Sequence, residues 1–364
     1  MLQGVRIVEI EGLGPGPFAA MMLADLGAEV IVIHRPGPQI GITGDPSPLD
    51  RGKKSIVLDL KDPDDLATAR ALISGADALI EGFRPGVMEK LGLGPEPCQA
   101  ANSRLVYGRM TGWGQDGPRA STAAHDYNYT ATSGALWYTS LPGSPPVPPP
   151  TLLGDIGGGA MYLVAGILAG LLQAARTGKG TVVDAAIVDG SAHMMALLMA
   201  TQSAGHLSME RGHSLFDGPH WSRCYACADG RHLSVQCFEP KFYAEFLCLM
   251  QLSDDPDFAE QYDPVQWPNQ IKKLADIILT KSADHWQELF DGSDACVAKV
   301  LSPEEAAQEP HMAARGIWRR VDGMLQPAPA PRFDGKLADI APSPRRGQHN
   351  DEIRAILTEN TKTR

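Results

Sequence analysis

Cysteine is scarce in this sequence, and its scarcity excludes a scaffold stabilised by disulfides. The chain has 6 cysteines in 364 residues, too few for a framework of that kind. Cys224 and Cys227 form a C-x-x-C pair, but no second pair stands at the spacing that a zinc site needs. On a strand, residues three apart point to opposite faces of the sheet. We therefore expect neither a metal site nor a redox pair.

The sequence also lacks an excess of positive charge. It has 32 Lys and Arg against 43 Asp and Glu, which gives a formal net charge of −11. Proteins that bind nucleic acid without sequence specificity rely on Lys and Arg to neutralise phosphates. We therefore expect no nucleic-acid partner.

No hydrophobic run is long enough to predict a membrane span. The most apolar stretch, 156–172, falls short of the roughly 20 apolar residues that a span needs and contains several glycines, so we expect a buried helix. Residues 5–10 have the pattern of a strand, and we expect no signal peptide. The C-terminal Lys362-Thr363-Arg364 is not a Ser-Lys-Leu peroxisomal signal. These features predict a cytoplasmic protein that does not contact a membrane.

The length and the hydrophobic fraction of 43% predict a globular protein of about two domains. In the first third of the chain, predicted strands alternate with predicted helices. The strands are 5–10, 29–33, 55–58, 78–80 and 105–110, and the helices are 18–26 and 62–74. This alternation is typical of a mostly parallel sheet with helices on both faces, so the predicted fold class is α/β.

The pattern changes in the second half. A Pro-rich loop at 142–150 precedes a long helix at about 158–175, a strand at 181–184 and a helix at 188–204. From Cys224 the pattern is α+β, because Asp229-Gly230 marks a hairpin between strands 224–227 and 232–238. Helices are predicted at about 240–252, 269–279 and 283–290, and a terminal helix at 351–357.

These patterns predict how the chain is divided. A large domain is expected over 1–190 and a small α+β domain over 223–320. Residues 191–222 are the expected linker, and 321–329 the expected return linker. The C-terminal segment 330–364 is then expected to rejoin the large domain.

A glycine-rich turn, 12–17, lies between the first strand and the first helix. Backbone N–H groups and the helix dipole at such a turn favour an anionic ligand. A dinucleotide site would need G-x-G-x-x-G and an acidic residue about 20 positions on, whereas this chain has G-x-G-x-G and ends its second strand in His34-Arg35. Arg35 would attract a phosphate, which disfavours NAD. A tight turn without any ligand is the alternative, and the turn alone leaves it open.

Basic residues gather after the strands of the same predicted sheet: Arg51, Lys53, Lys54, Lys61, Arg84 and Lys90. A group of charges is usually a solvated surface. Arg84, however, follows Ile80-Glu81-Gly82-Phe83, where a strand ends. Ligands of open parallel sheets bind at the carboxyl ends of the strands, and the arginine fork suits a phosphate. Arg84 is therefore a candidate phosphate ligand.

Three titratable residues are candidates for acid–base chemistry. Asp155 comes just before Gly157-Gly158-Gly159, and these glycines would let a ligand approach the backbone. Asp155 could equally be the N-cap of the following helix. His125 stands among aromatic residues, where a structural histidine is the usual interpretation, and Glu239 alone would be a surface residue. Only together do the three provide two bases and an orienting group.

The chain resembles the alpha-methylacyl-CoA racemases, within the family III CoA transferases (the CaiB/BaiF superfamily). The matching motifs run from Gly4 to about Arg332, nearly the whole chain. The shared motifs are Gly14-Pro15-Gly16-Pro17, Arg51-Gly52-Lys53-Lys54-Ser55, Asp59-Leu60-Lys61, Glu81-Gly82-Phe83-Arg84-Pro85-Gly86-Val87, Thr111-Gly112-Trp113-Gly114-Gln115 and Gly178-Lys179-Gly180. The racemase branch is marked by His125-Asp126-Tyr127-Asn128-Tyr129, Gly154-Asp155 and Glu239-Pro240.

This resemblance implies a Rossmann-like large domain and a smaller α+β domain in an interlocked homodimer. Each active site would lie between the large domain of one subunit and the small domain of the other. The implied substrate is an acyl-CoA thioester, so coenzyme A is part of the substrate and no separate cofactor is expected. The implied CoA contacts are Arg35, Leu58, Leu60, Lys61, Gly82, Arg84, Lys90 and Tyr129.

The resemblance also implies a reaction, the racemisation of 2-methylacyl-CoA thioesters by 1,1-proton transfer. His125 and Asp155 would be the two catalytic bases, and Glu239 would support His125. One base removes the α-proton, and the other group returns a proton to the opposite face of the enolate. Backbone N–H groups near Asp155 would stabilise the enolate oxygen. The ordinary pKa values of His and Asp differ by over two units, so at least one must be shifted.

Two alternatives remain open beside racemisation. A CoA transferase would use Asp155 as a nucleophile that forms an acyl anhydride, but it would usually carry a glycine-rich loop near Glu239, which 235–240 lacks. A CoA-binding protein without catalysis would not need all three titratable residues. Segment 215–221 and Gln236-Cys237 depart from the family pattern, and we expect them to lie toward the acyl pocket. The identity of the acyl group therefore stays open.

Overall fold

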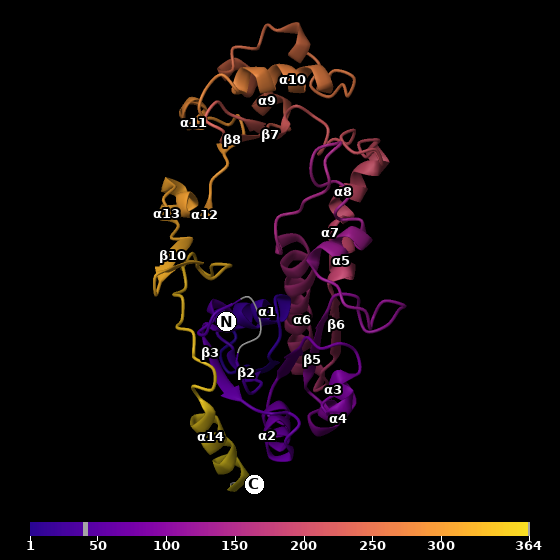
Figure 1. Ribbon diagram of the computed structural model, residues 1–364, viewed down its shortest axis with the longest axis vertical. Helices are drawn as coiled ribbons and strands as arrows, with labels where there is room; N and C mark the ends of the chain where they lie inside the picture. Colours follow the sequence, from indigo (N-terminus) through magenta and orange to yellow (C-terminus); the bar gives the residue numbers. More distant parts are fainter. Residues whose placement is uncertain (39–42, 363–364) are drawn as a thin grey trace. The chain divides into compact units, whose positions relative to one another are not determined.

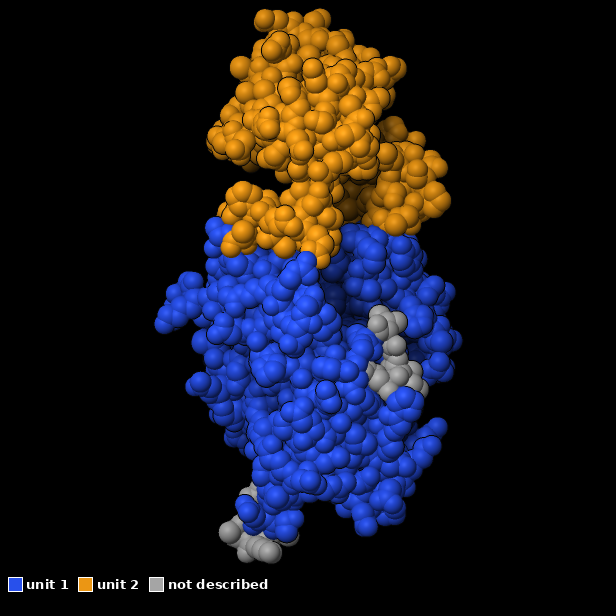
Figure 2. All heavy atoms as spheres, turned by 60° about the vertical axis from the view of Figure 1, so that its left-hand side comes forward, with its two compact units in different colours: residues 1–136, 148–195, 314–364 blue, residues 137–147, 196–313 orange. Residues whose placement is uncertain are grey.

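The computed structural model describes residues 1–38 and 43–362, and its chain divides into two compact units (Figure 2). Unit 1 comprises Met1–Leu136, Pro148–Met195 and Ala314–Arg364, and unit 2 comprises Trp137–Val147 and Ala196–Ala313. Segment 137–147, which we assigned to the large domain, belongs to unit 2. The reason is that the Arg211 guanidinium donates hydrogen bonds to the carbonyls of this segment, among them those of Thr139 and Ser144.

A six-stranded parallel sheet forms the centre of unit 1 (Figure 1). Its strands are β1 (Arg6–Ile10), β2 (Glu29–His34), β3 (Lys53–Val57), β4 (Ala78–Glu81), β5 (Val106–Thr111) and β6 (Val182–Ala186). Their order in the sheet is β3-β2-β1-β4-β5-β6, and every pair is parallel. The strands are rich in Val, Ile and Leu because both faces are covered. The predicted α/β class and parallel sheet are confirmed, with strand ends within two residues of the prediction.

Helices cover both faces of this sheet. Ile7 packs with α1 (Pro15–Asp25) and α6 (Met161–Thr177), whereas the next residue, Val8, packs with the helices of the other face. That second layer consists of α2 (Pro63–Ser74), α4 (Pro95–Ala101) and α14 (Asn350–Lys362). Shorter elements of unit 1 are η1 (Pro48–Asp50), α3 (Val87–Lys90), α5 (Asp126–Ser133), α7 (Ile187–Met194), and the hairpin of β10 (Trp318–Val321) and β11 (Met324–Pro327).

The longest apolar helix begins earlier than predicted. Its first part is the π-helical segment η2 (Leu152–Ala160), which continues directly into α6. Length and composition alone would allow Leu152–Thr177 to cross a membrane, as they would for many core helices. In unit 1, Leu163 and Ile167 are fully buried in the core cluster that includes Val106 of β5. One face of this helix is thus part of the core.

Unit 2 has its own sheet and core. β7 (Ser222–Ala226), β8 (His232–Gln236) and β9 (Val297–Lys299) are antiparallel, and the hairpin predicted at Asp229-Gly230 is present. The core packs this sheet against α9 (Pro240–Leu249), α10 (Trp267–Ile278) and α11 (Ala283–Phe290). The remaining elements are α8 (Ala196–Ala200), η3 (Thr201–Ala204), η4 (Pro256–Phe258), α12 (Pro303–Ala306) and α13 (Pro310–Ala314).

The C-terminal segment runs along the edge strand β3. The Gly347 N–H donates to Ser55 Oγ at 2.8 Å, and the Val57 N–H donates to Asn350 Oδ1 at 2.9 Å. The His349 N–H donates to the Ser55 carbonyl at 2.9 Å. These contacts satisfy backbone groups that an open sheet edge would expose.

Candidate active site

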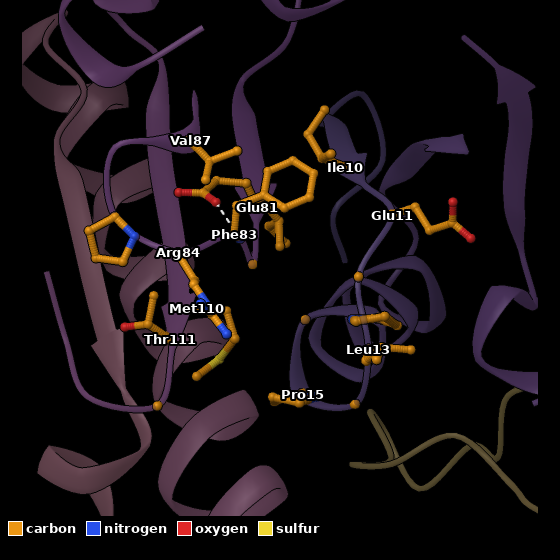
Figure 3. Close-up of a pocket in the computed structure, with 18 of the residues that line it drawn as sticks. Ile10, Glu11, Leu13, Pro15, Glu81, Phe83, Arg84, Val87, Met110 and Thr111 are labelled. Atoms are coloured by element: carbon orange, nitrogen blue, oxygen red, sulfur yellow. Dashed lines mark hydrogen bonds between the residues drawn. The ribbon is translucent and has the colours of Figure 1, made fainter. Parts of the chain in front are cut away.

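A cavity of about 1000 Å³ lies at the carboxyl ends of the strands in unit 1. Its walls include Glu11 after β1, Glu81 at the end of β4 and Thr111 at the end of β5 (Figure 3). The strand order reverses between β1 and β4, and open α/β sheets bind ligands at this switch point. The cavity therefore occupies the place where this fold is expected to hold its ligand.

All of the residues that the resemblance assigns to CoA line this one cavity. They are Arg35, Leu58, Leu60, Lys61, Gly82, Arg84, Lys90 and Tyr129. Most follow the ends of β2, β3 and β4, while Lys90 ends α3 and Tyr129 belongs to α5. The four cations among them are solvent-exposed and so remain available to a phosphate. Their role in binding CoA stays a prediction.

The turn that carries Arg84 is held by a buried carboxylate. Glu81 accepts a hydrogen bond from the Phe83 N–H at 2.8 Å (Figure 3). It accepts another from Arg109 Nε at 3.1 Å. Burial raises the pKa of Glu81 to about 7. Arg109 also pairs with Glu89 at 2.9 Å. Glu81 and Arg109 thus fix the start of the turn that carries Arg84 to β4 and β5.

The hydroxyl of Tyr129 already makes a hydrogen bond within the protein. It donates to the Ala124 carbonyl at 2.6 Å, and the Tyr129 ring packs edge-on against Trp113 with centroids 4.8 Å apart. A side chain at Gly112 would overlap the Tyr129 ring, so this position must be glycine. Tyr129 therefore lines the cavity and fixes the backbone just before His125.

Asp155 lies in the wall of the cavity, within η2. It is half-buried, and its Oδ2 lies 3.5 Å from where a Cβ on Gly14 of the glycine-rich turn would be. Burial, followed by the charge of Asp126, raises the pKa of Asp155 to about 6, although His125 opposes the shift. The N-cap of η2 is Thr151, so the interpretation of Asp155 as a helix cap is wrong.

Asp126 is a residue of this site that sequence reasoning missed. It is buried, and its Oδ1 accepts a hydrogen bond from the Asp155 N–H at 2.7 Å. That N–H is therefore not free for an enolate oxygen, contrary to our expectation. Asp126 Oδ2 has no hydrogen-bond partner in the described part of the chain. The only signal in the sequence was its place in the motif 125–129.

The glycines after Asp155 serve packing between helices. A Cβ on Gly158 would come within 2.3 Å of Ser191 Oγ, and one on Gly190 would come within 1.9 Å of the Gly158 carbonyl oxygen. A Cβ on Gly159 would meet Ile187 and Met110. The glycines let η2 and α7 approach closely, so our interpretation that they admit a ligand to the backbone is wrong.

His125 also lines the cavity and occupies the N-cap position of α5. Its own N–H donates to Asn128 Oδ1 at 3.1 Å, which fixes the start of the helix. The side chain is exposed, and its charge is close enough to Asp155 to lower the pKa of that carboxyl. The imidazole is therefore available to a substrate in this cavity.

Glu239 belongs to unit 2, where it is the exposed N-cap residue of α9. It is not among the residues that line the cavity of unit 1. The nearby residues that we expected to face an acyl pocket divide into two groups. Leu215, His220, Trp221 and Cys237 are buried in the core of unit 2, which corrects that expectation for them. Phe216 stays exposed and stacks on Phe238, with centroids 6.1 Å apart.

The cysteines are free thiols in the structure. Cys224 of β7 is exposed, whereas Cys227, just past the end of β7, is buried. Across the described ranges there is no group of three or more His, Cys, Asp or Glu placed to hold a metal ion.

Comparison with known proteins agrees with the motifs. The family model for CoA-transferase family III matches residues 2–350. Human alpha-methylacyl-CoA racemase is 41% identical over 357 residues, covering 97% of this chain and 92% of the relative, and the mouse racemase is 40% identical over 359 residues with the same coverage. The crystal structure of a CAIB/BAIF family protein from Brucella suis superposes with a TM-score of 0.81 at 26% identity, covering 98% of this chain and 99% of that one. The predicted resemblance is confirmed, and this chain belongs to CoA-transferase family III.

Proposed function

We propose that this protein interconverts the R and S forms of 2-methylacyl-CoA thioesters by 1,1-proton transfer through an enolate. The observation that carries the proposal is the shared cavity. It is lined by His125, Asp155 and all the residues assigned to CoA. Relatives named alpha-methylacyl-CoA racemase, 40–41% identical over nearly the whole chain, support it.

The pKa of Asp155 supports a two-base reaction. One base must begin deprotonated and the other protonated, and the roles must reverse for the other enantiomer. The pKa of Asp155, raised to about 6, brings this carboxyl closer to a neutral working pH. A general acid or base is most efficient when its pKa lies near the working pH, so Asp155 can both accept and return a proton. His125 and Asp155 would face opposite sides of the α-carbon.

The enolate oxygen needs a donor other than the Asp155 N–H, which Asp126 holds. The first N–H groups of a helix have no partner within it. At the start of α5, the Asn128 and Tyr129 N–H groups bond to the His125 carbonyl, whereas those of Asp126 and Tyr127 make no hydrogen bond to the described residues. We place the thioester oxygen there. A preorganised donor of this kind is worth about 10²–10³ in rate.

Coenzyme A would enter as part of the substrate, with no other cofactor. Arg35, Lys61, Arg84 and Lys90 supply the positive charge for its phosphates, and Leu58 and Leu60 an apolar surface. Replacement of Asp155 or His125 should therefore leave CoA binding largely intact.

Glu239 and the dimer belong to the same proposal. In the interlocked dimer that the resemblance implies, the small domain of one subunit completes the site of the other. Glu239 would then orient the partner subunit's base. Two chains interlocked in this way cannot separate without extensive unfolding, so dilution should not release an active monomer. An active monomer in sedimentation at low concentration would refute this part.

The test is deuterium incorporation. The protein is incubated in D₂O with a panel of 2-methylacyl-CoA thioesters of one configuration, and both α-deuterium and optical rotation are followed. Racemisation with deuterium at the α-carbon is expected. If neither occurs with any thioester of the panel, the proposal is wrong.

A CoA-transferase reaction is the second candidate, favoured by one observation. The Asp155 carboxylate lies in the cavity wall, and its oxygens accept no hydrogen bond from the described residues. It could attack the thioester carbonyl, forming an acyl anhydride as the C–S bond breaks and CoA leaves as the thiolate. Hydroxylamine would attack the aspartyl carbonyl of this anhydride, leaving a hydroxamate on Asp155 and releasing the acyl group as its acid. An Asp155 hydroxamate found by mass spectrometry, without α-deuterium exchange, would replace racemisation by transfer.

A further inference from the structure

An acidic side chain stands in the wall of the cavity where the CoA phosphates are proposed to bind. Glu11 follows β1 at the carboxyl edge of the sheet, and its carboxylate accepts the Arg35 N–H at 2.9 Å. Its Oε2 also lies 3.9 Å from Arg35 Nε. The carboxylate therefore ties the end of β1 to the candidate phosphate ligand at the end of β2. Left uncompensated, its charge would repel a phosphate.

The compensating charge comes from the far end of the sequence. Arg346 pairs with Glu11 through both of its terminal nitrogens, Nη1 to Oε1 and Nη2 to Oε2, the latter at 3.2 Å. Arg346 Nη2 also donates to the Arg35 carbonyl at 2.7 Å, and Nη1 lies 2.9 Å from His34 Nδ1. One guanidinium thus binds the carboxylate and the backbone of Arg35 together. Bidentate pairs of this kind are both strong and directional.

Arg346 is held in place by the segment that carries it. Its N–H donates to Asp45 Oδ1 at 3.2 Å, and the next residue, Gly347, bonds to Ser55 on β3. The Arg346 and Glu11 side chains are only 10% and 16% exposed, whereas that of Arg35 is 48% exposed. Burial would raise the pKa of Glu11, but hydrogen bonds from His34, Arg346 and the Arg35 N–H lower it to about 2. Glu11 is therefore charged at neutral pH, with Arg346 buried against it and Arg35 facing outward.

We propose that Arg346 is a positioning residue for CoA binding, which neutralises Glu11 and holds Arg35 toward a CoA phosphate. The inference rests on the proposed binding of CoA in this cavity. Arg346 itself is turned toward Glu11 and would act through it. The C-terminal segment is then part of the binding site, because the sheet alone would present an acidic side chain beside Arg35.

The experiment compares Arg346→Met, Arg346→Lys, Glu11→Gln and the double variant Glu11→Gln/Arg346→Met. The dissociation constant of CoA is measured by calorimetry, and KM and kcat with one 2-methylacyl-CoA thioester. Arg346→Met should weaken CoA binding and raise KM by about tenfold or more, the usual loss for a charge-assisted contact, with kcat within about twofold. Arg346→Lys should fall between this variant and the wild type. The double variant should recover affinity to within about threefold of the wild type, because the repelling carboxylate is gone.

The recovery separates an electrostatic role from a purely structural one. If the double variant binds CoA as weakly as Arg346→Met, or if Arg346→Met binds as well as the wild type, the inference is wrong while the proposed function stands. If the wild type itself does not bind CoA, both fail. Arg319→Met is the matched control, since its exposed pair with Asp339 lies in the same C-terminal part of unit 1, and it should change nothing. If Arg346→Met does not fold, the Lys and double variants still decide.

Discussion

The two units differ in what they bury. Among the described residues, every buried Asp, Glu, Lys and Arg lies in unit 1: Glu9, Asp50, Arg51, Lys53, Glu81, Arg109 and Asp126. The core of unit 2 is built instead from aromatic and aliphatic side chains, among them Trp221, Phe246 and Phe258. Its buried polar side chains, such as His220 and Gln270, are uncharged types. Burial strongly lowers the pKa of His220, to about 3, so this histidine is neutral.

Burying a charge is costly, so the uneven distribution of buried charges between the two units needs a physical explanation. Removing a charge from water costs several kcal/mol unless a partner compensates it. In unit 1 these charges form two groups. Glu81 lines the cavity, with Arg109 bonded to it, and Asp126 binds the Asp155 N–H. The others lie at the start of β3, where Lys53 pairs with Glu9 and Asp50, and Arg51 with Asp25. Unit 2 reaches a packed core without that cost. Unit 1 thus combines buried charges beside the candidate site with buried pairs that join β3 to β1 and α1, whereas apolar packing accounts for the core of unit 2.

The largest effect is expected from removing the two candidate bases of unit 1, since the proposed reaction depends on both of them. Loss of a general acid–base group costs about 10²–10⁴ in rate. His125→Ala and Asp155→Asn should each lose racemisation by that factor in both directions, because each direction needs one donor and one acceptor. Each variant should still exchange the α-proton of one enantiomer in D₂O, using the base that remains.

The measurement is deuterium exchange, run separately on each enantiomer for both variants. Equal exchange of both enantiomers in one variant would contradict two bases on opposite faces and indicate a single base. Calorimetry with CoA is the control, since both variants should bind it like the wild type.

The next largest effect is on stability. Lys53 is fully buried in unit 1 between Glu9, at 2.6 Å, and Asp50, at 3.3 Å. Burial raises the pKa of Glu9, and the charge of Lys53 opposes this rise. Lys53→Met leaves both carboxylates without their cation, so we expect the free energy of unfolding in urea to fall by about 3–5 kcal/mol.

Two further variants test whether the loss of stability comes from burial of the unpaired charges. Lys272→Met removes a solvent-exposed pair with Asp276 in unit 2 and should change stability by less than about 0.5 kcal/mol. Glu9→Gln/Lys53→Met should recover much of the loss, because it removes the more deeply buried of the two carboxylates that Lys53 pairs with. A loss below about 1 kcal/mol for Lys53→Met would show that the buried pair does not stabilise unit 1.

The sheet could be predicted from the sequence because its information is local. Each strand is a short apolar run between turn residues, and the glycine-rich turn stands directly between β1 and α1. The buried network could not be predicted in the same way. Lys53 and Arg51 look like part of a basic surface, but their partners Glu9 and Asp25 are 44 and 26 residues away along the chain.

The site shows the same division between local and distant information. His125 and Asp155 could be named from motifs, since the family pattern marks their positions. The hydrogen bond from the Asp155 N–H to Asp126 spans 29 residues, and that from Arg346 to Glu11 spans 335. Nothing in the spacing indicates that these side chains meet. The glycines at 157–159 misled us because glycine permits close approach of a ligand and of a helix equally well.

A smaller effect is expected from the exposed cations of the cavity. Arg84→Ala or Arg35→Ala should raise KM for an acyl-CoA by about tenfold while kcat changes little, because binding common to the ground and transition states is lost. The wild-type affinity should also fall with added salt. Arg176→Ala, at the exposed end of α6, is the control and should leave KM unchanged. If KM is unchanged in both cavity variants, the assignment of these arginines is wrong.

The smallest effect is expected from removing a single buried charge of unit 1, that of Asp126. The charge of Asp126 is one of the causes that raise the pKa of Asp155 to about 6, the larger being burial. Asp126→Asn keeps an acceptor for the Asp155 N–H but removes the charge, so the pKa of Asp155 should fall while staying above its ordinary value. For the enantiomer on which Asp155 begins as the base, the rise of kcat/KM with pH should move to lower pH. For the other enantiomer, on which Asp155 begins as the acid, the decline at higher pH should move to lower pH as well.

Asp184→Asn is the matched control, because Asp184 also accepts a backbone N–H, that of Gln115 at 3.0 Å, and does not line the cavity. Profiles of Asp126→Asn that coincide with those of the wild type would mean that this buried charge does not tune the base beside it.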